Sequence, residues 1–251
     1  MALADAVPFA VAHWSLDEAS GTRVDSVGAN DLTDNNTVGT AAGKFGNAAD
    51  FESGSSESLS RTDNVDLSVG DIEWMIRCWV NLESEPGEMA IVGKCVLGDT
   101  NNIDYRLRYT GANGFDFFVT PDGVFGNRTT VSTGDIGVTT GTWYLIHCWH
   151  DPVANEIGIA VNGGAAVTQA HSTGVFDGTG VFTLGDLLGF GQFWDGLIDD
   201  VVILKGYILD ATERTEDYAG GAGVAFENWD AVSGLGWLEE EGLLYQLVTR
   251  W

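Results

Sequence analysis

The sequence is poor in basic residues. It contains 11 Lys and Arg against 37 Asp and Glu, which gives a formal net charge of -26 at pH 7. Proteins bind phosphate backbones and anionic membrane surfaces through Lys and Arg that displace counterions. The shortage of basic residues therefore excludes nucleic acid and membrane as expected partners.

Cysteine is also scarce, and its spacing excludes two kinds of site. Cys78, Cys95 and Cys148 are an odd number and form no Cys-x-x-Cys pair. The sequence therefore predicts neither a disulfide framework nor a zinc site. Buried free thiols are the expected state of all three.

Long apolar runs are missing as well. No stretch approaches the ~18 apolar residues of a membrane span. Residues 1–9 have neither the basic region nor the apolar core of a signal peptide, so we expect synthesis in a cytosol. This does not fix the final location, because a virion protein is also made in the host cytoplasm and released by lysis.

Glycine is what the sequence has in excess. It accounts for 34 of 251 residues, close to twice the usual ~7%. Glycine supports turns with positive φ, and short apolar runs without a 3.6-residue period indicate strands. The sequence predicts an all-β, two-sheet antiparallel jelly-roll sandwich, with strands at 11–16, 48–51, 72–82, 90–96, 105–109, 115–119, 143–150, 157–161, 181–184 and 197–204.

One segment near the C-terminus is typical of a helix. Asp210 stands at the N-cap position and Glu213 three residues later, which together form a capping box. Gly220 and Gly221 follow and end the helix. We therefore expect one short C-terminal helix over 210–218.

The composition changes after the glycines at 220–223. Residues 1–219 are expected to form the jelly-roll domain, and 220–251 a Gly-rich link with an apolar, Trp-rich tail. Such a tail buries its aromatic residues either against its own domain or against a partner chain. In the second case it serves docking or oligomerisation, and its expected partner-binding residues are Trp229, Trp237, Leu244 and Trp251.

Several separated motifs occur in a fixed order between residues 10 and 219. They include His13-Trp14-Ser15-Leu16-Asp17-Glu18, Gly43-Lys44-Phe45-Gly46-Asn47-Ala48 and Gly196-Leu197-Ile198-Asp199-Asp200-Val201. In this order the chain resembles the laminin G-like, concanavalin A-like lectin/glucanase jelly-roll family. The resemblance implies two face-to-face antiparallel sheets but no single function.

The resemblance also implies a metal site. Many relatives bind one structural calcium ion that ties the first strand to the last, and calcium takes six to eight oxygen ligands. Strand alternation allows only one of the two neighbouring Asp residues at 199 and 200 to face the core side. The alternative is that the acids of the 17–25 turn cap that turn and the others are solvated. The positions that match the motifs are Asp17, Glu18, Asp25, Asn47, Asp199 and Asp200.

Catalytic motifs are missing from the sequence. Laminarinase-type relatives carry Glu-x-Asp-x-x-Glu on a strand, which places two carboxyl groups in one cleft. This spacing does not occur, nor does a Gly-x-Ser-x-Gly elbow or a phosphate loop. The sequence therefore predicts a protein that is not an enzyme.

Four side chains are predicted to share one face of a sheet. Arg77 and Trp79 alternate with aliphatic residues in one expected strand, as His147 and Trp149 do in another. If the aliphatic sets face the core, these four lie on the other face, where aromatic rings can stack on sugars. The alternative is that loops, the tail or a neighbouring subunit cover them.

Two functions fit these features. The first is a non-catalytic adhesion or assembly protein of a phage virion surface, such as a capsid decoration, head fibre or tail appendage, that also binds a host glycan. Its expected location is the virion, and its tail contacts itself or other virion proteins. The alternative is a carbohydrate-binding, lectin-like module of a bacterial surface or a polysaccharide-degrading system, with a cytoplasmic or extracellular location.

Overall fold

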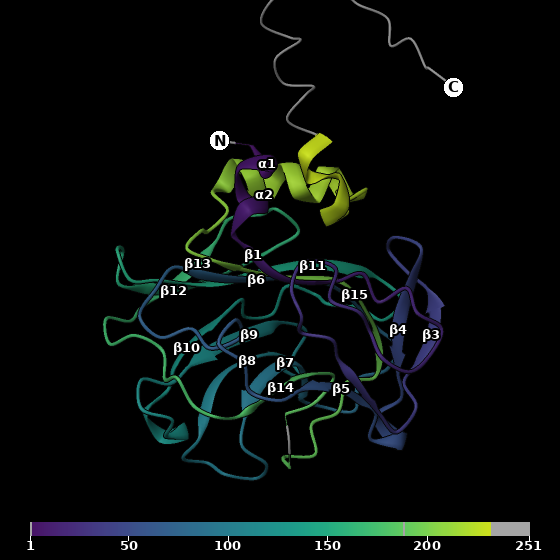
Figure 1. Cartoon of the computed structure of the whole chain (residues 1–251), viewed down its shortest axis with the longest axis horizontal. Helices are drawn as coiled ribbons and strands as arrows, with labels where there is room; N and C mark the ends of the chain where they lie inside the picture. The colour runs from purple at the N-terminus through teal and green to yellow at the C-terminus, as the bar shows by residue number, and fades with distance from the viewer. Residues whose placement is uncertain (1, 188, 232–251) are drawn as a thin grey trace, which may run out of the picture.

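Two antiparallel β-sheets pack face to face, and a helical cap covers the outer face of one of them (Figure 1). The structure is a computed structural model that describes residues 2–187 and 189–231. The predicted all-β sandwich with a short C-terminal helix is confirmed. Among the described residues, no helix is long and apolar enough to cross a membrane.

The capped sheet has eight strands, in the order β13-β12-β11-β6-β15-β4-β3, with β1 paired to β15. Its centre is β6, which pairs with β11 on one side and β15 on the other. The strands are β1 (Ala10–Trp14), β3 (Gly39–Ala42), β4 (Asn47–Phe51), β6 (Trp74–Leu82), β11 (Trp143–Asp151), β12 (Glu156–Val161), β13 (Val167–Ala170) and β15 (Gly196–Lys205).

The second sheet has seven strands, in the order β10-β9-β8-β7-β14-β5-β2. Its outer face points away from the cap (Figure 1). The strands are β2 (Thr33–Asn35), β5 (Ser58–Arg61), β7 (Met89–Cys95), β8 (Ile103–Tyr109), β9 (Phe115–Val119), β10 (Thr129–Ser132) and β14 (Val181–Leu184).

The main core lies between the sheets and follows strand alternation. On β6 the inward set is Trp74, Ile76, Cys78, Val80 and Leu82, all buried. The β6 residues between them point to the cap. There a second apolar cluster joins the sheet to both ends of the described chain. Because β6 is apolar on one side and covered on the other, all nine of its residues are buried.

The helical cap combines the start of the chain with residues 211–229. Helix α2 begins at the capping box that the sequence predicts, because the Asp210 side chain accepts hydrogen bonds from the backbone N–H groups of Thr212 and Glu213. The sequence did not predict the helix at residues 3–6. The helices are α1 (Leu3–Ala6), α2 (Ala211–Tyr218) and the 3₁₀ turns η1 (Val7–Phe9), η2 (Ser53–Ser55), η3 (Phe125–Asn127), η4 (Ala219–Gly221) and η5 (Phe226–Asn228).

A buried arginine anchors the cap to the capped sheet. Arg77 on β6 donates from Nε and Nη2 to both carboxylate oxygens of Asp217 on α2, at 3.0 and 2.9 Å. It also donates from Nη1 to Asp200 Oδ2 at 2.5 Å and from Nη2 to the carbonyl of Val224 at 2.9 Å. The guanidinium is fully buried, so its charge is balanced entirely by these partners.

A bulge in β15 sets the direction of two acidic side chains. Between the pairs Asp199–Trp79 and Val202–Arg77, β15 contains one more residue than β6. Asp200 adopts φ = 48° there. The extra residue breaks the alternation, and Asp199 and Asp200 both line one pocket on the cap side. Alternation would place the two on opposite faces, and the bulge is the reason that they lie on the same side.

We predict that Arg77→Met lowers the free energy of unfolding by about 3–5 kcal/mol, because it leaves two buried carboxylates without a cation. Urea denaturation would measure the loss. Arg128→Met, which removes an exposed guanidinium, is the control and should change the free energy by about 0.5 kcal/mol or less.

The loss should also depend on pH. Burial acts to raise the pKa of Asp200 and Asp217, but Arg77 and the histidine partners lower both below the ordinary value of 3.8. A lowered pKa adds stability above pH 3.8, and this is lost as the pH falls through the folded-state pKa. The difference between wild type and Arg77→Met should shrink in acid. A difference that stays constant down to pH about 2 would contradict the ion-pair assignment.

Candidate functional site

A groove of about 520 Å³ lies between the edge of the capped sheet and the start of α2. Trp149 from β11 and Thr168 from β13 line it on the sheet side. Tyr207 and Arg214 line it on the cap side. This volume falls within the usual range of small-ligand sites.

A glycine on the neighbouring strand makes room for Trp149. Gly158 on β12 pairs with Trp149, and a Cβ atom built on Gly158 would lie 2.1 Å from Cζ2 of the indole. The indole ring therefore lies flat across β12. Any residue other than glycine at position 158 would displace the ring. Trp149 is 4% exposed and forms part of the groove lining.

Two cap residues fix the other wall of the groove. The Arg214 guanidinium stacks over the Trp149 ring at 4.7 Å, and its Nη1 donates to the carbonyl of Leu209 at 2.5 Å. The Tyr207 hydroxyl donates to Glu213 Oε1 at 2.6 Å, and its ring stacks on Phe9 at 5.1 Å. These contacts hold an aromatic ring and a cation in fixed orientations beside the indole.

Acidic side chains surround these groups. Because β12 and Arg214 cover the Trp149 ring, Tyr207 is the aromatic side chain that offers a surface to a ligand, and the guanidinium and carboxylates supply donors and acceptors for hydroxyl groups. That chemistry suits a neutral polyhydroxylated ligand. The acidic residues of the lining are Glu73, Asp151, Glu156 and Asp210.

The predicted open face with Arg77, Trp79, His147 and Trp149 is corrected by the structure. The four residues do lie on one face of the capped sheet, but the cap buries them, with exposed fractions of 0, 0, 0 and 4%. Of the four, only Trp149 lines the groove. The sequence shows the alternation within a strand but not what covers its outer side.

The covered residues have partners within the chain. His147 Nε2 lies 2.8 Å from Asp217 Oδ2, and burial lowers the pKa of this histidine. Trp79 lies beneath Tyr218, with ring centroids 6.1 Å apart, and Lys44 Nζ lies 4.5 Å from the Trp79 ring. Both side chains therefore support the cap.

Trp229 also belongs to the cap. It is fully buried, lies under the Arg77 guanidinium at 5.8 Å and donates from Nε1 to the carbonyl of Val224 at 3.4 Å. Its predicted role in partner binding is corrected, because its surface is used within the chain. The other expected partner-binding residues, Trp237, Leu244 and Trp251, lie outside the described residues.

A second, smaller pocket of about 140 Å³ brings together three of the predicted metal ligands. Asp17, Asp199 and Asp200 line it, together with Glu227 from η5. Asp199 Oδ2 accepts from the backbone N–H of Phe45 at 2.9 Å. Asp199 Oδ1 is buried and has no hydrogen-bond partner among the described residues.

The chemistry of this pocket fits a cation. Burial raises the pKa of Asp199 to about 7, because a buried carboxylate without enough donors is costly to ionise. A divalent cation beside Oδ1 would remove that cost. Asp17, Asp199 and Glu227 are the residues that could supply carboxylate oxygens, whereas Asp200 already pairs with Arg77 and His13.

The other predicted ligands have structural roles outside this pocket. Asp25 accepts hydrogen bonds from the backbone of His13 and Asn30, and Glu18 accepts from Val24. Asn47 donates its backbone N–H to Asp17 Oδ1 at 2.7 Å. The six-residue site is therefore corrected, because Glu18, Asp25 and Asn47 are not part of it. Glu227 was missed since it lies far from the motifs in sequence.

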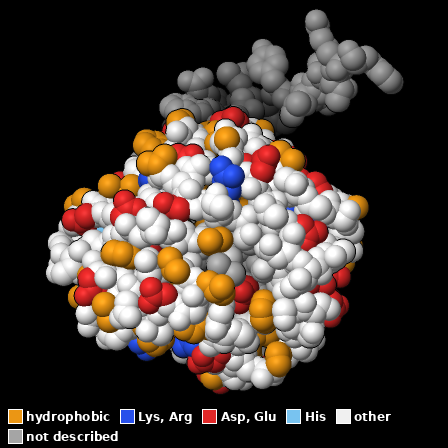
Figure 2. All heavy atoms as spheres, turned by 60° about the horizontal axis from the view of Figure 1, so that its bottom comes forward, with side chains coloured by type: hydrophobic (Ala, Val, Ile, Leu, Met, Phe, Trp, Pro, Cys, Tyr) orange, Lys and Arg blue, Asp and Glu red, His pale blue; other side chains and the backbone are white. Residues whose placement is uncertain are grey.

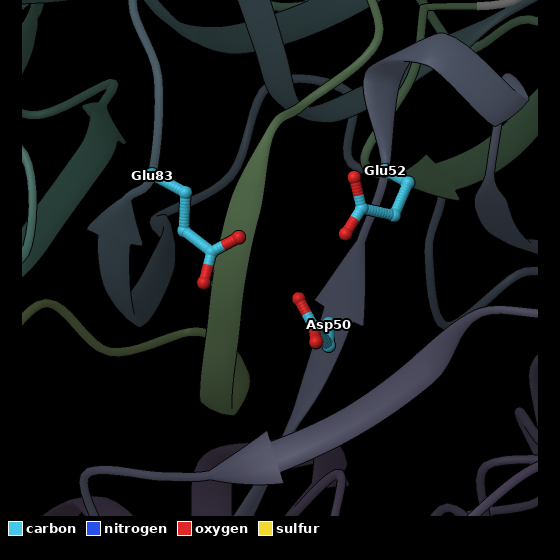
Figure 3. Close-up of side chains that lie close together, drawn as sticks. All are labelled: Asp50, Glu52 and Glu83. Atoms are coloured by element: carbon cyan, nitrogen blue, oxygen red, sulfur yellow. The ribbon is translucent and has the colours of Figure 1, made fainter.

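A third acidic group lies at the end of the capped sheet. Asp50, Glu52 and Glu83 offer carboxylate oxygens within 4.8 Å of one another, and Figure 3 shows them converging from two neighbouring segments. Burial raises the pKa of Asp50 and Glu83, and so does repulsion, from Asp195 on Asp50 and from Asp50 and Glu52 on Glu83. Asp50 is half-buried and the other two are exposed, so solvent weakens their repulsion.

Solved structures share this fold at low sequence identity. The binding domain of Paraclostridial mosquitocidal protein 1 superposes with a TM-score of 0.68 at 13% identity, over 86% of this chain and 52% of that one. A structure of botulinum neurotoxin type C gives 0.65 at 14%, over 86% and 52%. Domain 4 of AbnA, a GH43 extracellular arabinanase from Geobacillus stearothermophilus, gives 0.57 at 21%, over 82% and 97%.

The superposed region thus spans about half of each toxin chain and nearly all of the arabinanase domain. No curated protein matches the sequence. Residues 53–213 match the model of one protein family, which is well over half of the chain. The chain belongs to the concanavalin A-like lectin/glucanases superfamily.

Proposed function

We propose that this protein is a non-catalytic glycan-binding module whose binding site is the groove beside Trp149. The observation that carries the proposal is the composition of the groove, where Trp149, Tyr207 and Arg214 lie in fixed orientations among carboxylates. Sugar rings stack their C–H faces on aromatic side chains, and their hydroxyl groups bond to carboxylate and guanidinium groups.

Related structures support a sugar ligand. The arabinanase domain 4 is described in complex with arabinotriose, and cell entry of botulinum neurotoxin type C is described as dependent on two ganglioside molecules. The arabinanase domain has nearly the same extent as this chain. It supports the role of a lectin-like module in a bacterial surface or polysaccharide-degrading system.

The carboxyl groups with the largest shifts in pKa support binding without catalysis. Glycosidases keep one carboxyl group protonated near neutral pH as the general acid. Within the described residues, burial raises the pKa of Asp104 and Asp186 to about 6 and that of Asp199 to about 7. None of the three lines the groove.

Glycan binding by the same groove would also fit a surface component of a phage virion. A virion appendage and an extracellular module both present a glycan-binding jelly roll to the outside of a cell. The described part of the C-terminal segment packs inward, since Trp229 is fully buried. The described part of the C-terminal segment therefore favours the glycan-binding module over the assembly protein, because it leaves Trp229 no surface for a partner chain.

We predict that Thr168→Trp weakens glycan binding about tenfold or more. Thr168 is exposed on the edge strand β13 and lines the groove, so an indole there fills the site without entering the core. A glycan array that includes arabinotriose and ganglioside oligosaccharides, followed by calorimetry on the positive ligands, would measure the effect. We expect a loss of about tenfold or more in affinity, or about 1.4 kcal/mol.

Gln169→Trp is the matched control. Gln169 is also exposed on β13 but points to the opposite face of the strand, so this variant should bind as the wild type does. A wild-type protein that binds no glycan, or a Thr168→Trp variant with unchanged affinity, would refute the groove as a glycan site.

We also propose that the pocket at Asp199 holds a structural calcium ion. The supporting observation is the unpartnered, buried Oδ1 of Asp199. Ligands from Asp17, Asp199 and Glu227 would connect the first loop, β15 and the cap. Backbone carbonyls and waters supply the remaining oxygens in calcium sites of this kind.

Calcium should stabilise the protein more at high pH than at low pH. The folded-state pKa of Asp199 is about 7 against an ordinary 3.8, so without a cation its contribution to stability falls as the pH rises between these values. Calcium binds the ionised form, and its effect grows as the pH rises through about 7. Melting temperatures with and without millimolar CaCl₂ would measure it at pH about 6 and about 8.

Two variants identify the site that is responsible. Asp199→Asn should remove the calcium effect and raise the melting temperature of the metal-free protein, because the amide needs no ionisation. Glu83→Gln removes a carboxylate from the exposed acidic group instead and should keep the effect. If Glu83→Gln removes it and Asp199→Asn does not, the ion binds at Asp50, Glu52 and Glu83.

A further inference from the structure

The outer face of the second sheet carries a cluster of arginine and phenylalanine side chains. We call it the Arg–Phe patch and define it as Arg106, Phe118, Phe125, Arg128 and Gln192. Arg106 on β8 pairs with Phe118 on β9, and Phe125 belongs to η3. The patch lies on the far side of the sandwich from the cap (Figure 1).

Basic side chains are rare on this side of the molecule. Figure 2 turns this side toward the viewer and shows red acidic groups spread over it, with blue basic groups at only a few places. A chain with 37 acids and 11 basic residues has carboxylates available for every arginine. Even so, among the described arginines Arg77 and Arg108 alone form ion pairs with carboxylates. The other described arginines lack such a carboxylate partner.

Arg106 is such an arginine. It is 4% exposed, and among the described residues its one hydrogen-bond acceptor is the side-chain oxygen of Gln192, 2.5 Å from Nη1. Its Nε is buried and has no partner. A guanidinium has five N–H donors, and leaving a buried one with a single neutral acceptor costs free energy.

The nearest acids are used by the next arginine along β8. Arg108 donates to both carboxylate oxygens of Asp116, from Nε to Oδ1 at 2.8 Å and to Oδ2 at 2.9 Å and from Nη2 to Oδ2 at 2.7 Å. It also pairs with Glu88. Burial and the charge of Arg108 lower the pKa of Arg106 to about 10, so Arg106 remains a cation at neutral pH.

Aromatic rings hold the guanidinium groups in place. The Arg106 guanidinium lies 4.8 Å from the Phe118 ring, and that of Arg128 lies 4.0 Å from the Phe125 ring. The two rings meet edge to face at 5.7 Å. Phe125 is half-buried and Arg128 exposed, whereas Arg106 and Phe118 are 4% and 1% exposed. A ligand that approaches the patch therefore meets Phe125 and Arg128 and reaches Arg106 through its small exposed fraction.

We propose that the Arg–Phe patch is a second ligand site, which binds the carboxylate of an acidic sugar. A carboxylate matches the planar fork of a guanidinium and would supply the acceptors that Arg106 lacks. The adjacent Phe125 ring offers a surface for the C–H face of the sugar that bears it. The site is separate from the groove and does not depend on it.

A polymer with a high density of negative charge is a poorer ligand. The net charge of -26 repels it at long range. At an ionic strength near 0.15 M the Debye length is about 8 Å. A single carboxylate in contact with Arg106 is attracted locally while the repulsion from distant acids is screened, which favours an acidic sugar residue over a phosphate polymer.

Trigalacturonic acid and its fully methyl-esterified form are the probes that test this proposal. The ester keeps the sugar rings and removes the charge. We expect calorimetry with the full chain at 0.15 M salt to detect binding of the acid and at least a tenfold weaker interaction with the ester. Binding of neither form, or equal binding of both, would overturn the proposal.

Variants locate the site. Arg106→Gln and Arg106→Lys should each weaken binding about tenfold, the second because it keeps the charge but loses the fork. The exposed Arg128→Gln, which does not disturb the core, should weaken it about threefold. Arg61→Gln makes the same charge change on another strand of the second sheet and should leave the affinity unchanged.

Two further results would contradict the proposal, and a third would support it. If Thr168→Trp in the groove abolishes binding of trigalacturonic acid while the patch variants retain it, the acid binds in the groove. If a triglutamate peptide binds the patch as tightly as trigalacturonic acid, the patch is a general carboxylate site and not a sugar site. If Thr168→Trp leaves acid binding intact, the patch acts independently of the groove.

Discussion

The balance of charge around Arg77 determines how much of the molecule is accessible. A fully buried guanidinium on the central strand must be paired, and its partners Asp200 and Asp217 come from a strand bulge and from the cap helix. The cap therefore stays on the sheet. As a result, the aromatic residues at the centre of the face under the cap are structural, and of the four residues Arg77, Trp79, His147 and Trp149 only Trp149 reaches the groove at the margin of the cap.

The sequence was sufficient for the sandwich and for helix α2, because period-two patterns and a capping box are local signals. It also placed Trp79 and Trp149 on the same face. It was not sufficient for the burial of that face. Burial depends on residues 3–9 and 219–229, which are distant in sequence and show no strong periodicity. The lining of the pocket at Asp199 could not be predicted for a similar reason: the bulge at Asp200 breaks alternation, and Glu227 comes from the cap.

Five of the eleven basic residues lie inside the protein. Arg23, Arg77, Lys94, Arg106 and Arg214 are buried, and Arg23, Lys94 and Arg77 bond there to backbone carbonyls or carboxylates. The surface is consequently even more acidic than the composition implies. Arg214 and Arg106 lie against the rings of Trp149 and Phe118, beside the two proposed ligand sites, whereas the ring at Arg77 belongs to Trp229 inside the cap. The two proposed ligand sites thus use the cations that are least committed to the fold.

The pairing of β1 with β15 has a consequence for how the chain folds. Trp14 lies opposite Val201, so the strand that opens the domain finds its neighbour only when nearly the whole domain has been synthesised. Contacts of such sequence separation cost loop-closure entropy and make folding slow. Until β15 arrives, the apolar side of β6 and the edge of β4 stay without their partner, and during synthesis these strands are the segments most exposed to aggregation.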